Sequence, residues 1–391
     1  MARLLGCRLS ACVAVLIIVS LATPVSAEVG AVIPAGNSPY RAVYDSSTNQ
    51  IYVTNSGDSS VSVISDSANA IVASLTVGRL PWNIVYDSGK GTIWVANAGS
   101  NTLSVIDDKT NGVIKTLNTG SFLDPLAYDS GKGEIFLAGP GSINQSSVLI
   151  INDTSYSTIG TLNVNGGIAG CAYDSNKNEV FFACRTTSNS SVVVVDDRND
   201  SIVSSVSLAN YVQSIVYDPK RGEVFVACTY DSVYVISDST NQVTATITVG
   251  NSPQDITYDS SRGEIFLVNA ISISDGTDGQ DTIEQGYLVA INENTNSVIG
   301  WLPLATTPSC IVYDSSKQEL FLVDSLNDTI SVISDSVMLS TKPLPTPQPG
   351  LTTSFNALGE IIALLFILPV ILTVIFLTIR SRKSTNRVTI A

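Results

Sequence analysis

The sequence predicts an all-β fold built from seven copies of one four-stranded unit. The body of the chain is rich in Ser, Thr, Asn, Val and Ile and lacks helical periodicity. A Tyr-Asp pair recurs along it, with the tyrosines at Tyr44, Tyr86, Tyr128, Tyr173, Tyr217, Tyr258 and Tyr313. The spacings are 42, 42, 45, 44, 41 and 55 residues, which fits one four-stranded blade per copy. We therefore expect a seven-bladed β-propeller.

The second copy shows the four strands of the repeat. Residues 82–86, 92–97, 102–106 and 112–118 concentrate β-branched and aromatic residues, and turn residues separate them. Their lengths are typical of strands. The first hairpin turns at Asp87, Gly89 and Gly91. The following copies repeat this order, so each is expected to form one antiparallel sheet.

The two ends of the repeat array predict how the ring closes. The seventh copy stops after its third strand, 329–333, without a clear fourth strand. Residues 28–39 resemble the fourth strand and exit of another copy, 245–253, and both end in Gly-Asn-Ser-Pro. We expect residues 28–35 to complete the last blade, because closure removes free strand edges.

The motif Tyr52-Val53-Thr54-Asn55 resembles the signature of YVTN-family β-propeller repeats, which are common in surface-layer and exported proteins. Later copies carry weaker forms at 94–97, 225–228 and 266–269. The resemblance covers all seven copies. It implies a propeller fold and an exported surface protein, and it carries little information on activity.

The ends of the chain predict export and a single membrane anchor. Residues 1–27 combine a basic start, an apolar run and Val25-Ser26-Ala27, which is typical of a cleaved signal peptide; an uncleaved anchor is the alternative. The propeller is expected over 28–339 and a Pro-rich spacer over 340–356. An apolar segment, 357–379, has the length of a transmembrane helix, and the basic tail 380–391 is expected in the cytoplasm. Pro349-Gly350 before this helix also resembles a sortase-like cleavage tail.

Charge and composition exclude several classes of function. The net charge of −14 argues against nucleic acid as a partner. The chain has no histidine, which excludes Ser-His-Asp centres and His-ligated metals. Cys171, Cys184, Cys228 and Cys310 remain after signal cleavage, and they show no metal-binding spacing. We expect buried free thiols rather than disulfides.

One face of the disc is predicted to carry two rings of acids, at the turns after the first and third strands of each copy. A cation-binding ring is one interpretation. We favour the other, in which each acid caps its own turn through backbone N–H groups. The rings are Asp45, Asp87, Asp129, Asp174, Asp218, Asp259 and Asp314, and then Asp66, Asp108, Asp153, Asp197, Asp238, Glu293 and Asp335.

The opposite face has loops that differ between copies, and function is better sought there. An insertion at 271–286 carries Asp275, Asp278, Asp281 and Glu284, which are candidate Ca²⁺ ligands; a solvated loop is the alternative. No other cofactor and no catalytic residues are predicted. Glycosylation sequons occur at Asn144, Asn152, Asn189, Asn199 and Asn327.

The sequence therefore predicts a non-catalytic cell-surface propeller. It would be anchored in the cell membrane by one span, with the propeller outside, and would serve adhesion, envelope structure or binding of a surface glycan or protein. The alternative is an exported propeller enzyme of the quinone-dependent dehydrogenase or lyase type that acts without histidine.

Overall fold

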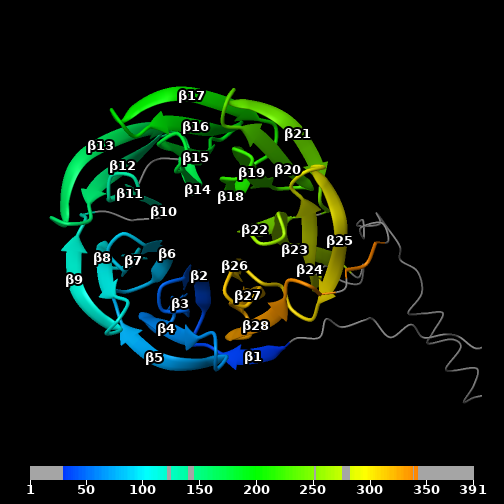
Figure 1. The fold of residues 1–391 in the computed structure, drawn as a ribbon, viewed down its shortest axis with the longest axis horizontal. Coiled ribbons are helices and arrows are strands. Elements are labelled where there is room, and N and C mark those ends of the chain that lie inside the picture. Colours follow the sequence, from blue (N-terminus) through cyan, green and yellow to red (C-terminus); the bar gives the residue numbers. More distant parts are fainter. Residues whose placement is uncertain are drawn as a thin grey trace, which may run out of the picture. The chain divides into compact units, whose positions relative to one another are not determined.

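The computed structural model describes residues 30–120, 125–139, 145–250, 252–274, 282–337 and 339–341, and side chains at 271–274 and 282–284 are not described. The chain divides into two units, Met1–Ala270 with Gln285–Leu344, and Ile271–Glu284 with Pro345–Ala391. In the first unit the strands form seven four-stranded antiparallel sheets, arranged as a ring around a central axis (Figure 1). The predicted seven-bladed propeller is thus confirmed.

The blades are numbered along the chain, and in blades 1 to 6 the first strand of each is innermost (Figure 1). Blade 1 is β2 (Pro39–Asp45), β3 (Gln50–Asn55), β4 (Ser60–Ser65) and β5 (Ala70–Thr76). Blade 2 is β6 (Pro81–Asp87), β7 (Thr92–Asn97), β8 (Thr102–Asp107) and β9 (Gly112–Asn118). Blade 3 is β10 (Leu126–Asp129), β11 (Glu134–Ala138), β12 (Gln145–Asn152) and β13 (Ser157–Asn165).

The remaining blades continue the same order around the ring. Blade 4 is β14 (Gly167–Asp174), β15 (Glu179–Arg185), β16 (Ser190–Asp196) and β17 (Ser201–Leu208). Blade 5 is β18 (Val212–Asp218), β19 (Glu223–Cys228), β20 (Ser232–Ser237) and β21 (Gln242–Thr248). Blade 6 is β22 (Pro253–Asp259), β23 (Glu264–Ser274), β24 (Thr282–Asn292) and β25 (Ser297–Leu304). Blade 7 is β26 (Cys310–Asp314), β27 (Glu319–Asp324), β28 (Thr329–Ser334) and the N-terminal β1 (Ala31–Pro34).

The ring closes as the sequence predicts. Strand β1 pairs antiparallel with β28, with Ile33 opposite Ile330. The side chain of Ile33 is buried and packs with Ile51 of blade 1 and Phe321 of blade 7. The first and last parts of the propeller are therefore joined by both a backbone ladder and an apolar core.

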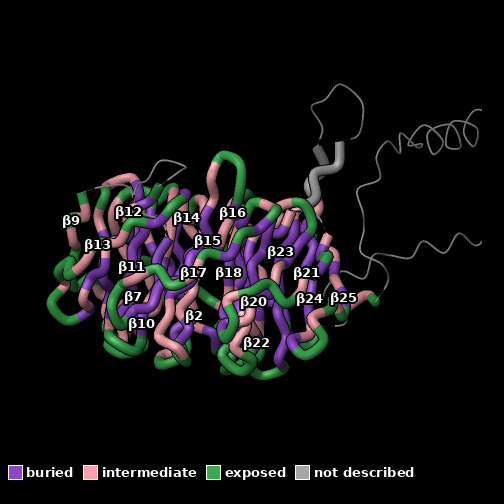
Figure 2. The backbone as a smooth tube through the Cα atoms, turned by 90° about the horizontal axis from the view of Figure 1, so that it is seen from above, coloured by how far each residue is buried: buried purple, intermediate pink, exposed green. Residues whose placement is uncertain are grey.

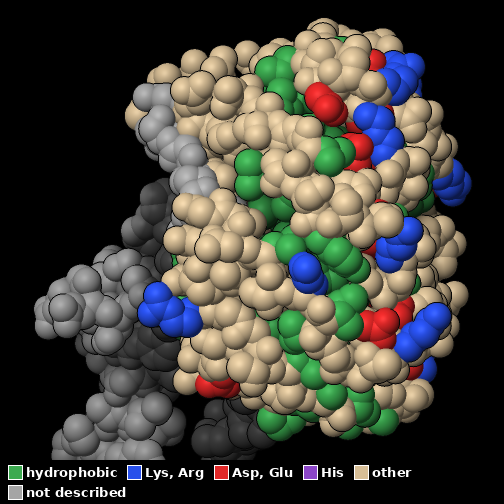
Figure 3. All heavy atoms as spheres, turned by 90° about the vertical axis from the view of Figure 1, so that its left-hand side faces the viewer, with side chains coloured by type: hydrophobic (Ala, Val, Ile, Leu, Met, Phe, Trp, Pro, Cys, Tyr) green, Lys and Arg blue, Asp and Glu red, His purple; other side chains and the backbone are tan. Residues whose placement is uncertain are grey.

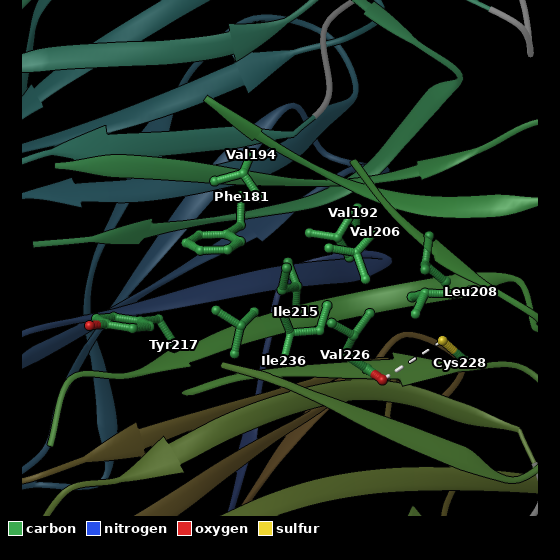
Figure 4. Packing of buried hydrophobic residues seen from close by; sticks show 13 residues of the cluster. Phe181, Val192, Val194, Val206, Leu208, Ile215, Tyr217, Val226, Cys228 and Ile236 are labelled. Carbon is green, nitrogen blue, oxygen red and sulfur yellow. Dashed lines mark hydrogen bonds between the residues drawn. The ribbon is translucent and has the colours of Figure 1, made fainter. Parts of the chain in front are cut away.

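The hydrophobic core lies between blades. Each junction between neighbouring sheets holds one cluster of buried side chains, seven clusters in the described residues. Figure 4 shows the junction of blades 4 and 5, where Phe181, Val194 and Val206 face Ile215 and Val226. Because both faces of the middle strands are covered, second strands such as β7 are buried along their whole length. Outermost strands such as β9 are largely exposed (Figure 2).

The insertion in the sixth copy lengthens two strands. Strand β23 runs to Ser274 and β24 begins at Thr282, so part of the segment predicted as a loop is strand. The predicted spacer from 342 onward, the transmembrane segment 357–379 and the tail 380–391 lie outside the described residues. Among the residues that are described, no helix is long and apolar enough to cross a membrane.

Candidate functional site

The first ring of acids caps the turns, as predicted. All seven carboxylates are fully buried, and each accepts backbone N–H groups from residues two and three positions ahead. At Asp129, for example, Oδ1 accepts from Gly131 N at 2.7 Å and from Lys132 N at 3.1 Å. Each acid satisfies donors that the tight turn would otherwise leave unpaired, so this ring is explained without a ligand.

The second ring of acids has a different role from the predicted one. Four of these side chains accept from the repeat tyrosine of their own blade, as when the Tyr258 hydroxyl donates to Glu293 at 3.0 Å. Asp108 instead accepts from Ser47 of the preceding blade at 2.9 Å, and Asp66 accepts from Ser316 of blade 7 at 2.9 Å. The prediction of self-capping was wrong because the cap is the residue before, such as Asp107 or Asn152, whose carboxylate or amide oxygen accepts from the turn.

Cations from the first turns extend these contacts from blade to blade. Lys177 of blade 4 lies 3.2 Å from Asp238 of blade 5, and Lys220 of blade 5 lies 2.6 Å from Glu293 of blade 6. Lys317 closes the circle by donating to the backbone oxygen of Asp66 at 2.7 Å. In the side view, charged groups of both signs gather along one rim of the disc (Figure 3). We interpret this face as a structural joint between blades.

The four cysteines of the described chain are thiols and not disulfides, as predicted; Cys184, Cys228 and Cys310 are buried, whereas Cys171 is half-buried. Cys171 lies opposite Phe182 in the ladder, whereas Cys184 pairs with Ile168. Burial raises the pKa of both Cys184 and Cys228 to about 12. These thiols therefore stay protonated and act as small apolar side chains rather than nucleophiles.

A polar cavity opens on the other face, where the innermost strands begin. Its volume is about 450 Å³, within the range of small-molecule sites. Residues from blades 1, 2, 4, 5, 6 and 7 contribute, so the cavity occupies the mouth of the central channel. We call it the mouth cavity; it is lined by Tyr40, Arg41, Asn83, Gly167, Ile168, Ala169, Arg185, Gln213, Gln254 and Ser309.

Several side chains that line the mouth cavity lie at β-bulges in the innermost strands. In blades 1, 2, 4, 5 and 6 the register between first and second strands shifts at this point, for example between Val212 and Ser214 and between Pro253 and Asp255. Gln213 and Gln254 are the extra residues of those two bulges. A bulge bends the strand and re-aims the side chain it carries, and bulges recur beside binding sites. The same local device therefore brings bulge residues of blades 1, 4, 5 and 6 to one cavity, whereas Asn83 of blade 2 pairs in register with Ala96.

The two arginines of the mouth cavity are held by the surrounding chain. Arg41 Nη1 donates to Ser309 O at 2.6 Å and lies 3.8 Å from Asp255 Oδ2, and the guanidinium sits 5.0 Å from the centre of the Tyr40 ring. Arg185 Nε donates to Val212 O and its Nη2 donates to Gln213 Oε1, both at 2.5 Å. These contacts cross between blades and fix the direction of both cations.

Asp255 is an acidic residue beside Arg41. It is buried, and it accepts from the Ser214 hydroxyl at 2.6 Å and from Ile311 N at 3.1 Å. With Arg41 beside it, its oxygens are occupied by contacts to blades 5, 7 and 1. These contacts hold the Asp255 carboxylate in one orientation.

Sequence reasoning missed the mouth cavity residues, although the copies contain a signal for them. Aligned on the Tyr-Asp pair, the position of Arg41 is occupied by Asn83, Gly170 and Ser214 in other blades, whereas the aspartate after each tyrosine never changes. Arg185 aligns with small residues such as Ala98 and Ala270. Some positions of the repeat keep the same residue in every copy and others vary. We infer that the side chains at the varying positions are not required for the fold.

Several predicted sites are not tested. Asp275, Asp278 and Asp281 lie outside the described residues, and the side chain of Glu284 is not described, so calcium binding stays a prediction. Elsewhere in the described chain no cluster of three or more metal-ligating groups occurs. Asn189, Asn199 and Asn327 are exposed, Asn152 is half-buried with its amide oxygen accepting from Ser155 N, and Asn144 lies outside the described residues.

Comparisons with known proteins support the fold alone. No protein-family model matches the chain, and no curated protein sequence matches it. A solved chain of hydrazine synthase from Kuenenia stuttgartiensis is similar, with a TM-score of 0.65 and 13% identity, over 81% of this chain and 99% of that one. The β-propeller domain of Cps50 (Swd1) from Myceliophteria thermophila is also similar, with a TM-score of 0.62 and 7% identity, over 78% of this chain and 98% of that one.

Proposed function

We propose that this protein is a non-catalytic cell-surface propeller that binds its ligand in the mouth cavity. One observation carries the proposal: a cavity of about 450 Å³ is lined by side chains at which the copies differ, on a scaffold whose other positions repeat. A rigid scaffold with variable positions at one opening is the usual arrangement of a binding site. The YVTN-family resemblance of the repeats agrees with an exported binding protein.

The groups that face the mouth cavity favour binding over catalysis. Those described are arginines, amides and hydroxyls, and the nearby Asp255 is engaged by Ser214, Ile311 and Arg41. General acid–base chemistry needs a group that exchanges a proton near the operating pH. The described lining offers none, which weighs against the exported-enzyme alternative.

Binding by the intact chain to glycan and protein arrays tests the proposal. The informative variant is Ala169→Trp, because Ala169 lines the cavity and the equivalent strand position in blade 2 carries Trp82. We expect this side chain to be tolerated by the strand and to abolish binding. Val203→Trp on the exposed outer strand β17 is the matched control and should bind like the parent protein. If Ala169→Trp binds the array ligands as tightly as the parent protein does, the proposal is contradicted.

The predicted location follows from the ends of the chain and is part of the same proposal. A cleaved signal at 1–27, a spacer at 340–356 and a span at 357–379 would hold the propeller outside the membrane. Protease treatment of intact cells should then remove the propeller. A chain truncated before residue 357 should appear in the medium. Its retention on the cell surface would refute the anchor, and its retention inside cells would refute the export signal.

A further inference from the structure

The described part of the chain ends against the outer strand of blade 6. The outermost place in blade 7 is taken by β1, and after β28 the chain crosses to β25 instead. There Ser340 and Trp301 form an antiparallel bridge: Trp301 N donates to Ser340 O at 3.1 Å, and Ser340 N donates to Trp301 O at 2.7 Å. Val337 and Leu339 pack against the apolar cluster between blades 6 and 7. The outer edge of β25 thus already holds one residue pair of a fifth strand.

Gly300 of β25 makes room for this crossing. It follows the bulge of its strand, and a Cβ placed there would lie 2.5 Å from Leu339 Cβ and 3.2 Å from Ser340 O. Gly160 holds the same place in blade 3, where the nearest atom to an added Cβ would be Ile150 Cδ1 at 3.2 Å. Gly300 is buried, whereas Gly160 is half-buried. The close approach of the C-terminal segment therefore requires glycine at position 300, and blade 3 has no such requirement at the equivalent position.

The bridge also sets the direction of the chain that follows it. Because Ser340 and Trp301 pair antiparallel, the residues after Ser340 head toward Ser297, where β25 begins. This end of β25 lies on the turn face, the face that carries the turns after the first and third strands of each blade. The opposite, mouth face carries the mouth cavity.

The prolines beyond Ser340 are placed so that this strand can continue. In an antiparallel ladder, residues whose N–H and C=O both bond to the neighbouring strand alternate with residues whose groups point away. Ser340 bonds through both groups, so in an extended continuation Lys342 and Leu344 would direct theirs to β25. Proline lacks an N–H, which suits the outward positions of an edge strand and blocks the addition of a further strand. The prolines that follow all have this outward parity: Pro343, Pro345, Pro347 and Pro349.

We propose that residues 342–345 dock along β25 from Gly300 to Ser297, as the continuation of a fifth strand of blade 6, and that this strand directs the spacer to the turn-face side of the ring. The occupant is the next segment of the same chain, because its covalent link to the seated Ser340 gives it a high effective concentration at this edge. With the proposed anchor at 357–379, the turn face would lie toward the membrane and the mouth cavity away from it. That consequence rests on the proposed function, whereas the docking does not.

Amide hydrogen exchange of the intact chain in detergent tests the docking, with a free peptide of residues 336–352 as the reference. We expect the amides of Lys342 and Leu344 to exchange at least about tenfold more slowly than in the peptide, because a hydrogen-bonded amide must open before it exchanges. Gln348, beyond the end of β25, should exchange at the peptide rate. Peptide-like rates at Lys342 and Leu344 would overturn the inference. Protection that increases with protein concentration would also overturn it, because a second copy of the chain would then occupy the edge.

Two pairs of variants separate the docking from general destabilisation. Leu344→Pro removes an N–H that faces β25 and should speed exchange at Lys342 by about threefold to tenfold, as expected for loss of one hydrogen bond. Thr341→Pro removes an N–H that points away and should leave that rate unchanged. Gly300→Val should displace the segment and abolish the protection, whereas Gly160→Val should preserve it. If the two proline variants behave alike, the proposed bonding phase is wrong.

The direction of the spacer has a separate measurement. In liposomes with a quencher on the lipid headgroups, a dye attached through Ser88→Cys on the turn face should be quenched more than one attached through Asp231→Cys on the mouth face; both positions are exposed. Equal quenching would overturn the directing role of the strand, even if Lys342 and Leu344 are protected. Neither result depends on a ligand in the mouth cavity, which Ala169→Trp tests on its own.

Discussion

The two faces of the ring are built from the same repeat but differ in what varies. On the turn face the same aspartate, tyrosine and second-turn acid recur in every blade and bond to one another or to the next blade. On the mouth face the position three residues before the repeat tyrosine changes from Arg41 to Asn83 to Ser214. Repetition therefore marks the groups that hold the blades together, and variation marks the groups available for recognition. The difference can be tested by perturbing each face separately.

Opening the ring at its seam should have the largest effect, because both faces depend on closure. Ile33→Ala removes a buried side chain from the junction of blades 7 and 1, on a strand of only four residues. We expect a loss of about 3 kcal/mol in the free energy of unfolding, typical of deleting a buried isoleucine. Urea unfolding measures it. Val32→Ala, on the exposed side of the same strand, should change stability by less than about 0.5 kcal/mol.

Removing a turn-face acid should be the next largest effect. Asp129→Ala removes the buried carboxylate that accepts from the N–H groups of Gly131 and Lys132 in this turn, and we expect a loss of about 2 kcal/mol in the free energy of unfolding. Asp231→Ala, at an exposed acid in a loop of the mouth face, is the control and should be nearly neutral. If the two variants unfold at the same urea concentration, the structural role of the turn face is wrong.

The pH dependence of stability should also come from the turn face. Burial, with Asp129 close by, raises the pKa of Asp197 to about 7, although Tyr173 and Lys132 oppose the shift; burial and Asp259 raise the pKa of Asp335 to about 6. The folded state then retains protons that the unfolded chain releases near pH 4. Stability from these groups is complete below about pH 4 and is lost as the pH rises through 6 to 7.

Unfolding midpoints at pH 5 and pH 8 measure this effect, and the protein should be more stable at pH 5. Asp107 and Asp196, whose pKa values are lowered by hydrogen bonds from Thr110 and Arg198, lose their contribution only at more acidic pH and do not enter this window. Asp197→Asn imitates the protonated carboxyl and should flatten the dependence. Greater stability at pH 8 than at pH 5 would contradict the raised pKa values of Asp197 and Asp335.

Substitution at the mouth should have the smallest effect on stability. Arg185→Ala loses hydrogen bonds to Val212 O and Gln213, but it introduces a residue type that Ala98 and Ala270 supply in other blades. We expect a change below about 1 kcal/mol in urea unfolding. A loss as large as that of Asp129→Ala would mean that Arg185 belongs to the framework, and the contrast between the faces would disappear.

The fold was predictable from the sequence because residues that form the turns and strands recur at the same position in each copy of the repeat. Tyr44 and its counterparts, the first-turn aspartates and the closing strand around Ile33 follow from spacing and turn chemistry alone. The role of Asp108 and Asp66 was not predictable in this way, since their donors lie on another blade. The mouth cavity was missed because bulges, which no local pattern announces, bring Gln213 and Gln254 to one opening.

A crystal structure of the intact chain with its tightest array ligand tests the central contrast most directly. The account predicts ligand density in the mouth cavity, in contact with residues from at least two blades and with Arg185 among them. Density on the turn face, or on the outer strands of a single blade, would contradict it.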